Sequence, residues 1–575
     1  MKKLMIYLRD YKKESVLAPL FKLLEAFFEL MVPLVMANIV DKGISQGDNS
    51  YIFKMGLCLV ALALVGLVSA VTAQFFAARA AVGFATKLRK ALFGHIQSLN
   101  FSNIDKVGTS TMITRMTADI NQVQSGVNMV LRLFLRSPII VFGAMIMAFT
   151  IDVECALVFV VAIPVLALVV FGIMIWTMPY YKKVQGRLDK VLGITRENLT
   201  GVRVIRAFHK EEGEQEYFEE NNRALASLQM FVGKISACMN PVTYIVVNAA
   251  AMFLIYMGAV RVNIGTLTQG EVLAILNYMS QILVELIKLA NLIVTITKAL
   301  ACADRVAGVF DIQNEEEIIT VYQKKEKEPY LCFENVSLTY KGAGEATLKN
   351  IDFSVNKGET IGIIGGTGSG KTSLVNLIPK FYPFTEGSIR IEGKDLTEYG
   401  EEELRNKVGV VPQKAVLFKG TIESNLKWGK EDATEEEMWE ALTTAQAKEI
   451  VEGKEGVLKA EVAQNGKNFS GGQRQRLTIA RALIRKPEIL ILDDSASALD
   501  YATDAKLREA LRKIEKNTTT FIVSQRASSI MHADKIIVLD DGEQVGLGTH
   551  EQLLTNCEVY REIYFSQFEK ESVAR

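Results

Sequence analysis

Cysteine is scarce in this sequence, and neither sign of charge predominates. The cysteines stand singly and form no C-x-x-C pair, so we expect buried thiols rather than a zinc site or a disulfide framework. They are Cys58, Cys155, Cys238, Cys302, Cys332 and Cys557. The 65 Lys and Arg residues balance 65 Asp and Glu residues, and no basic cluster is interleaved with aromatic residues. We therefore expect no nucleic-acid partner.

A removable signal peptide is not expected at the start of this sequence. The N-terminal segment MKKLMIYLRDYKKE is positively charged but has no short apolar run that ends in a small-residue cleavage site. Its apolar residues Leu4, Leu8 and Tyr11 instead recur at helical spacing among basic residues. We expect residues 1–14 to form a short helix that lies on the cytoplasmic surface of a membrane.

Apolar residues, by contrast, are abundant. They make up 49% of the 575 residues and the mean hydropathy is positive, a combination that is high for a soluble protein of this size. Crossing a bilayer takes about 20 mostly apolar helical residues, and six stretches meet this criterion, at roughly 16–40, 55–78, 130–150, 153–177, 238–260 and 272–297. We predict an all-α, six-helix transmembrane domain over residues 15–310, in the plasma membrane.

The connections between these stretches predict the orientation of the chain. The second-to-third and fourth-to-fifth connections are long and rich in Lys and Arg, whereas DKGISQGDNS and RVNIGTLTQGE carry few. Positive charge favours the cytoplasmic side, so we expect the long connections and both termini there. Because Pro is absent and Gly sparse over 80–100 and 181–233, we expect these connections to continue the helices.

Several charged residues fall inside the predicted spans, where each must face protein or water. Glu25 and Glu29 are four residues apart, on one helix face. We favour a role in helix packing, but a pathway for cationic substrates or a proton-linked step stays open. Glu285 and Lys288, three residues apart, are expected to pair with one another. Arg136 is expected to extend toward the membrane surface.

The pattern of apolar and polar residues changes after a charged linker, which we place at 311–330. From 331 to 570, short β-branched runs alternate with amphipathic helical segments, which predicts an α/β domain. The segment TIGIIGGTGSGKTS fits G-x-x-x-x-G-K-[ST], a P-loop whose backbone N–H groups bind phosphate oxygens. The predicted nucleotide-binding residues of this loop are Gly365, Gly366, Thr367, Gly368, Ser369, Gly370, Lys371, Thr372 and Ser373.

The chemistry of such a loop needs a metal ion as well as a lysine. Lys371 is expected to reach the β- and γ-phosphates, and the Thr372 hydroxyl to bind Mg²⁺. Asp493 ends an apolar strand, and its carboxylate is expected to be the second protein ligand of Mg²⁺. The sequence therefore predicts a site for ATP with Mg²⁺.

Further motifs in the same order resemble the ATP-binding cassette family, and nearly the whole chain resembles its six-span exporter half-transporters. The resemblance implies that Tyr340 stacks on adenine, and that Gln413 in VVPQ contacts Mg²⁺ and the attacking water. It also implies that Phe101–Asp119 and Gly201–Phe208 couple the spans to the cassettes, the second one reaching the partner's cassette.

The family signature FSGGQ implies two cassettes that face one another. In the family, its serine and glycine N–H groups cap the γ-phosphate bound by the opposite subunit. The residues at these positions are Ser470, Gly471, Gly472 and Gln473. Because this chain has only one cassette, we expect a second half-transporter as its partner.

Two residues depart from the family at the hydrolytic centre. Asp494 stands where a hydrolysing cassette has the general-base Glu, and Gln525 stands where it has the switch His. Asp is one methylene shorter, and a displacement of about an ångström can cost on the order of a hundredfold in rate. Only His can carry positive charge at the second position. This resembles the degenerate-site subunit of a heterodimeric multidrug exporter.

The predicted function is therefore ATP-dependent efflux of hydrophobic or amphipathic compounds, as one half of a heterodimer of non-identical chains. An ATP-gated module that does not pump, or a slow homodimeric exporter that uses Asp494, remains an alternative. Peptide export is not expected, because no protease-like domain precedes the first span. The sequence does not distinguish lipid substrates from drug substrates, because the substrate cavities of such exporters are broad and apolar. The six spans exclude a soluble cassette ATPase.

Overall fold

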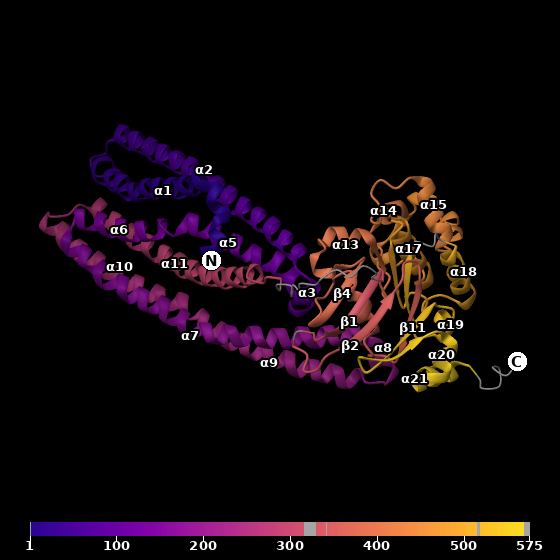
Figure 1. Ribbon diagram of the computed structural model, residues 1–575. Coiled ribbons are helices and arrows are strands. Elements are labelled where there is room, and N and C mark those ends of the chain that lie inside the picture. Colours follow the sequence, from indigo (N-terminus) through magenta and orange to yellow (C-terminus); the bar gives the residue numbers. More distant parts are fainter. Residues whose placement is uncertain (1, 315–328, 341, 514–517, 569–575) are drawn as a thin grey trace. The chain divides into compact units, whose positions relative to one another are not determined.

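The computed structural model describes residues 2–314, 329–340, 342–513 and 518–568. The chain divides into two compact units, which are described separately (Figure 1). The first comprises Met1–Ser98 and Gly108–Ile312, and the second comprises Leu99–Val107 and Gln313–Arg575. Residues 315–328 of the predicted linker lie outside the described residues.

The first unit is helical, and its described residues form six helices that are long and apolar enough to cross a membrane, which confirms the predicted six spans. Several are extended or divided by short turns of other helix types. The elements are η1 (Lys2–Tyr11), α1 (Lys12–Asn38), η2 (Ile39–Ile44), α2 (Asn49–Ser98), α4 (Thr109–Thr114), η3 (Arg115–Asp119), α5 (Ile120–Leu133), α6 (Arg136–Ile151), α7 (Val153–Thr200), α8 (Val202–Ala207), α9 (Glu211–Ala237), α10 (Met239–Ile264) and α11 (Gln269–Phe310).

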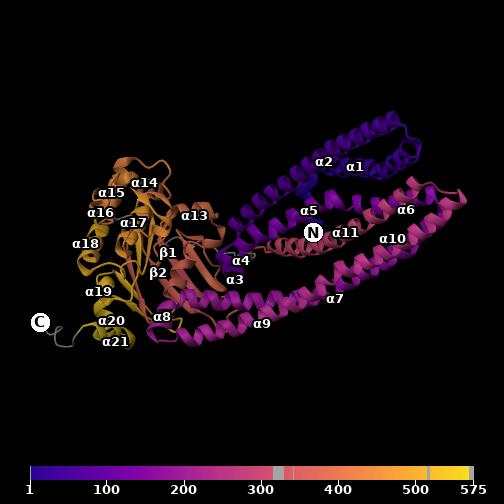
Figure 2. The same ribbon diagram turned by 180° about the vertical axis from the view of Figure 1, so that it is seen from behind.

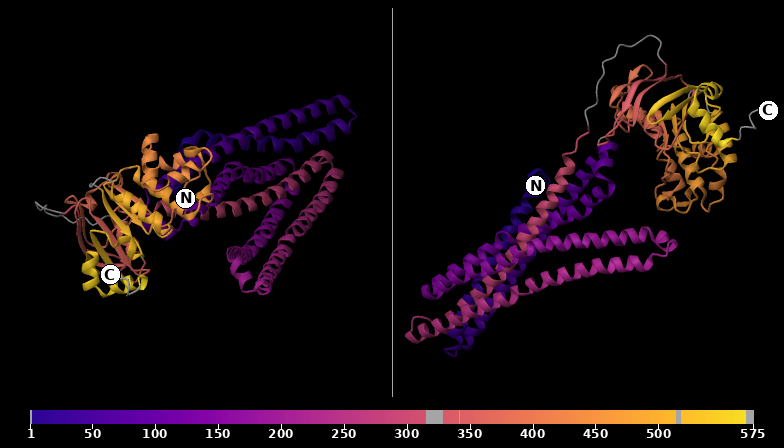
Figure 3. Two further views of the ribbon diagram at one scale, coloured as in Figure 1. Left: turned by 90° about the vertical axis from the view of Figure 1, so that its right-hand side faces the viewer. Right: turned by 90° about the horizontal axis from the view of Figure 1, so that it is seen from below.

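The long connections continue the helices, as predicted. Helix α7 has 48 residues, which at about 1.5 Å per residue exceeds twice the thickness of a hydrocarbon core. Helices α7 and α9 pack on one another (Figure 2) and diverge from α2, α5 and α11 toward the α8 end (Figure 3). At the other end of α7 the hairpin is tight, because Asp152 caps the helix by accepting from the Cys155 N–H at 2.8 Å.

The predicted position of the Arg136 side chain is wrong. Arg136 does not extend to the membrane surface but is 6% exposed, because it lies in the first turn of α6 facing α1 and α11. Its guanidinium donates to Glu29 and to Glu285, each at 2.6 Å. Lys288 donates to Glu285 at 2.7 Å, which confirms that predicted pair. These ion pairs join three helices.

The second unit contains a ten-stranded mixed sheet, which confirms the predicted α/β fold. The strand order is β5-β4-β1-β2-β12-β11-β3-β10-β9-β6. The strands are β1 (Leu331–Leu338), β2 (Leu348–Val355), β3 (Thr360–Gly365), β4 (Glu386–Ile391), β5 (Lys394–Asp395), β6 (Val408–Val411), β9 (Ile489–Asp493), β10 (Thr519–Val523), β11 (Lys535–Asp540) and β12 (Glu543–Gly548), with β7 (Gly420–Thr421) and β8 (Glu461–Val462) paired separately.

Helices lie between and around these strands. They are α3 (Phe101–Val107), α12 (Lys371–Leu377), α13 (Glu401–Lys407), α14 (Ile422–Leu426), α15 (Glu435–Thr444), α16 (Lys448–Glu452), α17 (Gly471–Leu483), α18 (Tyr501–Arg512), α19 (Ala527–Ile530), α20 (His550–Asn556) and α21 (Glu558–Gln567). Short 3-10 turns η4 (Leu396–Glu398), η5 (Val457–Lys459) and η6 (Gln464–Gly466) complete the described elements.

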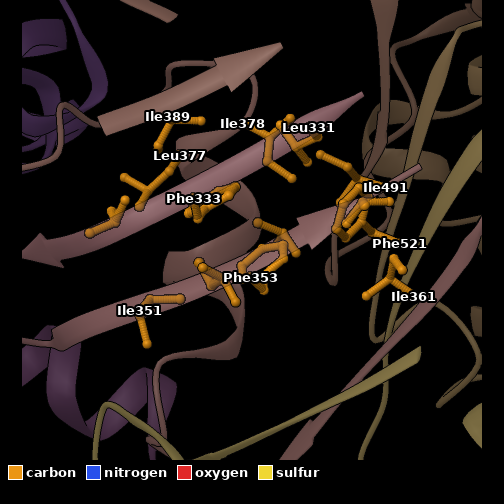
Figure 4. Close-up of a cluster of buried hydrophobic side chains, with 14 of the residues drawn as sticks. Leu331, Phe333, Ile351, Phe353, Ile361, Leu377, Ile378, Ile389, Ile491 and Phe521 are labelled. Carbon is orange, nitrogen blue, oxygen red and sulfur yellow. The ribbon is translucent and has the colours of Figure 1, made fainter. Parts of the chain in front are cut away.

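Parallel strands on one side of this sheet bring the functional loops together at their carboxyl ends. Strands β3, β10, β9 and β6 run parallel to their neighbours, so that their carboxyl ends lie together. All five residues of β9 are buried, as expected for a strand covered on both faces. Phe333 of β1 stacks on Phe353 of β2, with ring centroids 4.5 Å apart, in the core beside these strands (Figure 4). The packed core fixes where β3 and β9 end.

Candidate functional site

The loop between β3 and α12 has a backbone that requires glycine. Gly368 and Gly370 have φ values of 87° and 91°, in the left-handed region. At Gly365 a Cβ atom would lie 2.1 Å from the Leu539 carbonyl oxygen on the neighbouring strand. The loop therefore curls tightly at the end of β3, which is the local form expected of a phosphate-binding loop.

Lys371 lies within this loop, at the start of α12. Its ammonium group donates to the carbonyl oxygens of Gly365 at 2.9 Å and Gly366 at 2.6 Å. Burial lowers the pKa of Lys371, while the nearby carboxylates Asp494 and Asp493 act in the opposite direction. The loop thus holds a desolvated cation beside two acids.

The two acids follow one another at the end of β9. Asp493 is 5% exposed and accepts from the Thr372 hydroxyl at 3.0 Å. Burial raises the pKa of Asp493, and the adjacent carboxylate of Asp494 adds to the increase. Burial also raises the pKa of Asp494, although the amide of Gln413, which donates to it at 3.4 Å, and Lys371 favour the charged form. This cluster of buried acids and one cation is typical of a functional site.

A pocket of about 230 Å³ brings most of the predicted residues together. It is lined by Thr347, Thr367, Gly368, Gly370, Lys371, Thr372, Ser373, Gln413, Asp493, Asp494, Val523 and Gln525. Thr347 and Val523 were not predicted. Val523 ends a buried strand, and nothing in an apolar strand residue indicates a role at a pocket.

The signature residues lie elsewhere in the second unit. Among the described residues, Ser470, Gly471, Gly472 and Gln473 do not line the pocket that contains Lys371. Ser470 caps α17, because its hydroxyl accepts from the Gln473 N–H while the Gln473 side chain accepts from the Ser470 N–H at 2.9 Å. This capping box holds the N–H groups of the signature at the start of a helix.

Tyr340 is joined to the loop by its hydroxyl, which donates to Ser373 at 3.0 Å. Its ring meets Tyr382 edge to face, with centroids 5.1 Å apart. The Tyr382 hydroxyl donates to Asp105 of α3 at 2.6 Å, a contact within the second unit. Burial and the Asp105 carboxylate raise the pKa of Tyr382. The sequence did not point to Tyr382, whereas Asp105 lies within Phe101–Asp119, the first segment expected to couple the spans to the cassettes.

Both parts of the chain match known families. Residues 15–286 match the ABC transporter transmembrane region, and residues 348–497 match the ABC transporter family. The chain is 35% identical to an uncharacterized ABC transporter ATP-binding protein of Mycobacterium tuberculosis, over 98% of this chain and 97% of that protein.

Relatives whose names state a transport activity also align along nearly the whole chain. The Bacillus subtilis protein YgaD, named for multidrug export, is 32% identical over 99% of both chains. The ATP-dependent lipid A-core flippase of Salmonella typhimurium is 28% identical over 97% of this chain and 96% of that protein.

A solved structure has the same fold. It is a bacterial Atm1-family ABC exporter with ATP bound, and it matches 97% of this chain and all of that chain with a TM-score of 0.80. At 23% sequence identity, the likeness concerns the fold alone.

Proposed function

Because the chain belongs to the ABC transporter family as an exporter-type half-transporter, with membrane helices fused to one ABC ATP-binding domain, we propose that it exports hydrophobic or amphipathic compounds as one half of a heterodimer. The relatives named for multidrug export and for lipid flipping support this class of substrate. In this proposal the transporter lies in the plasma membrane, with the ATP-binding domain and both termini in the cytoplasm.

One observation carries the heterodimer proposal. Asp494 and Gln525, the two residues that depart from the family, both line the pocket around Lys371. The Asp494 carboxylate ends one methylene short of where a Glu would reach, and Gln525 cannot become positively charged. Two changes at one centre favour ATP binding with slow turnover in this pocket.

The remaining residues of the pocket fit nucleotide binding. In the proposal Lys371 and the loop amides from Gly365 to Ser373 bind the phosphates, and Tyr340 stacks on adenine. The Thr372 hydroxyl and the Asp493 carboxylate, 3.0 Å apart, offer the oxygen ligands that Mg²⁺ prefers, with Gln413 as a third. When bound, Mg²⁺ neutralises charge on the β- and γ-phosphate oxygens.

The partner is proposed to contribute the efficient hydrolytic site. The signature Ser470–Gln473 is intact and lies outside this chain's own pocket, so the N–H groups of Gly471 and Gly472, which the capping box does not use, are available to cap the γ-phosphate on the partner. Exposed apolar side chains in α8 and directly after it support a second contact with the partner, since Val204 of α8 is 60% exposed and Phe208, the next residue after α8, is 71% exposed.

The experiment is an ATPase assay on the purified full-length chain carrying Asp494→Glu, alone and co-purified with a candidate partner half. We expect the chain alone to stay at background, defined by Lys371→Ala, and turnover to appear only with the partner. Vigorous ATPase of Asp494→Glu alone would instead support the slow homodimer. Turnover by the complex without transport of any amphipathic compound would support the non-pumping module.

A further inference from the structure

A cavity of about 490 Å³ lies between α1 and α11 in the first unit. The two helices run antiparallel, because Asp41 contacts Thr268 near one end and Leu30 contacts Tyr278 further along. The α1 wall begins with Glu29 and continues with the apolar residues Val32, Pro33 and Met36. The cavity therefore combines charged groups toward one end with an apolar wall.

The charges near this cavity belong to a balanced network. Three cations, Lys22, Arg136 and Lys288, meet three carboxylates, Glu25, Glu29 and Glu285. Glu25 and Glu285 each have a lysine partner in addition to Arg136. Glu29 contacts only Arg136 among the described residues, through Oε2 at 2.6 Å. Its other carboxylate oxygen keeps its full capacity to accept hydrogen bonds.

Two members of the network are accessible from the cavity. The side chain of Glu29 is 38% exposed and that of Lys288 is 41% exposed, and both line the cavity. Lys288 donates to Glu285, which leaves two of its three N–H donors for another partner. The cavity thus presents one carboxylate and one ammonium group, each with unused hydrogen-bonding capacity.

A polar group without a partner also lies at the cavity. Gln281 lines it, and the side-chain oxygen Oε1 of Gln281 is buried with no hydrogen-bond partner among the described residues. A buried acceptor in a membrane span is costly unless a donor reaches it.

We infer that this cavity binds the headgroup of a zwitterionic amphiphile, with the ligand's cation at Glu29 and its anion at Lys288. The apolar chain lies along Val32, Pro33 and Met36. The inference rests on the proposed export of amphipathic compounds and names their chemical class. The net charge of the ion-pair network favours a zwitterionic headgroup, because the network's three cations and three carboxylates are already balanced. A singly charged ligand would leave an uncompensated charge within the membrane span, where charge is costly. A zwitterion adds one charge of each sign and keeps the balance.

The test is a binding assay on the full-length chain in nanodiscs. Radiolabelled hexadecyl sulfobetaine, whose cation lies next to the chain and whose sulfonate lies at the far end, is the probe, and the competitors share its chain: hexadecyltrimethylammonium, hexadecyl sulfate and hexadecyl maltoside. Because the chain is shared, and binding to protein-free nanodiscs is subtracted for each amphiphile, the headgroup sets the order of affinity. We expect the zwitterion to bind about tenfold more tightly than either singly charged amphiphile, as one lost charge-assisted hydrogen bond predicts.

Two variants locate the headgroup. Lys288→Gln is expected to weaken probe binding about tenfold and to shift the preference toward the cation, because the anion loses its partner. Glu29→Gln is expected to shift the preference toward the anion. Lys298→Gln, an exposed lysine on the same helix outside the cavity lining, is the matched control and should change nothing. ATP binding by each variant reports folding, and Lys288→Gln alone suffices if Glu29→Gln misfolds.

The outcomes separate this inference from the proposed function. Equal affinity for all four headgroups, or no effect of Lys288→Gln in a chain that still binds ATP, overturns the zwitterion assignment but leaves amphiphile export standing. Binding of a sulfobetaine headgroup without a long chain as tight as that of the probe overturns the amphiphile assignment. If no amphiphile binds at all, the proposed function fails as well.

Discussion

At the scale of single residues, the pocket around Lys371 places desolvated carboxylates where a nucleotide would bring further negative charge. Asp493 and Asp494 both have a raised pKa, chiefly because they are buried. In the proposed site Asp493 gains a metal ion, whereas Asp494 gains only the repulsion of phosphate. The negative charge of Asp494 therefore opposes ATP binding.

Removing the charge of Asp494 should strengthen nucleotide binding. We expect Asp494→Asn to lower the Kd for ATP several-fold, since about one kcal/mol of repulsion corresponds to roughly fivefold in affinity. The measurement is equilibrium binding of a fluorescent ATP analogue to the full-length chain. Asp432→Asn, an exposed acid outside the pocket lining, is the control. Weaker binding in Asp494→Asn would contradict the electrostatic argument.

A second residue-scale expectation concerns Tyr340. The variant Tyr340→Phe loses the hydrogen bond to Ser373 but keeps the ring, so ATP affinity should change little. The variant Tyr340→Ala removes the ring, and affinity should fall about tenfold if the ring stacks on adenine. The same binding assay distinguishes the two, and equal affinity of Tyr340→Ala and wild type would contradict the proposed stacking.

At the scale of elements, the short helix α3 is held to the second unit by aromatic side chains. Phe101 packs on Phe381, with ring centroids 4.7 Å apart, and Asp105 accepts from Tyr382. Tyr382 in turn meets Tyr340. A continuous set of contacts thus leads from the candidate adenine site to α3, the first segment expected to couple the spans to the cassette.

Loss of the Tyr382 hydroxyl should loosen α3. A hydrogen bond to a charged acceptor is worth about 1.5–3 kcal/mol, so Tyr382→Phe should increase local opening of this helix at least tenfold. Hydrogen exchange of residues 101–107 in the full-length chain measures that opening. Tyr501→Phe, at an exposed tyrosine, is the control. Unchanged exchange over 101–107 would show that ring packing alone holds α3.

The C-terminal helices should make the second unit sensitive to acid. Burial lowers the pKa of His550, whose ring nitrogen Nδ1 lies 2.8 Å from the Tyr560 hydroxyl. A depressed pKa contributes stability above the ordinary value of about 6.5, and that stability is lost as pH falls. The unfolding temperature should therefore drop more between pH 7.5 and 5.5 in wild type than in His550→Gln. His209→Asn, at an exposed histidine, should behave as wild type.

The sequence predicts an element well where its structure depends on residues that are close together in the chain. Glycine spacing predicts the phosphate loop, and apolar length predicts the spans, because each depends on neighbouring residues. The burial of Arg136 could not be predicted, because it depends on which helices face α6. The Tyr382 contact joins residues 277 positions apart, and no local pattern encodes it. The roles of the individual pocket residues remain predictions.

At the scale of the whole molecule, the signature and the pocket of one chain are expected to serve different ATP molecules. We expect Ser470→Arg to lower the ATPase rate of the complex at least tenfold while this chain's own ATP affinity is kept. Lys371→Ala should abolish that affinity and lower the rate less. Ser470→Thr keeps the helix cap and is the control. If Ser470→Arg left the rate unchanged, the signature would not serve the partner's site.

Residues 99–107 belong to the second unit, so neither unit is a single continuous stretch of the sequence. The chain passes between the two units at three places, after Ser98, after Val107 and after Ile312, rather than once. An ATP-binding domain excised after residue 312 would leave the aromatic surface of Phe381 and Tyr382 bare, and should be less soluble than one that retains α3. Exchange of such domains between half-transporters, by recombination or by design, therefore has to carry a second, distant segment of the sequence with it.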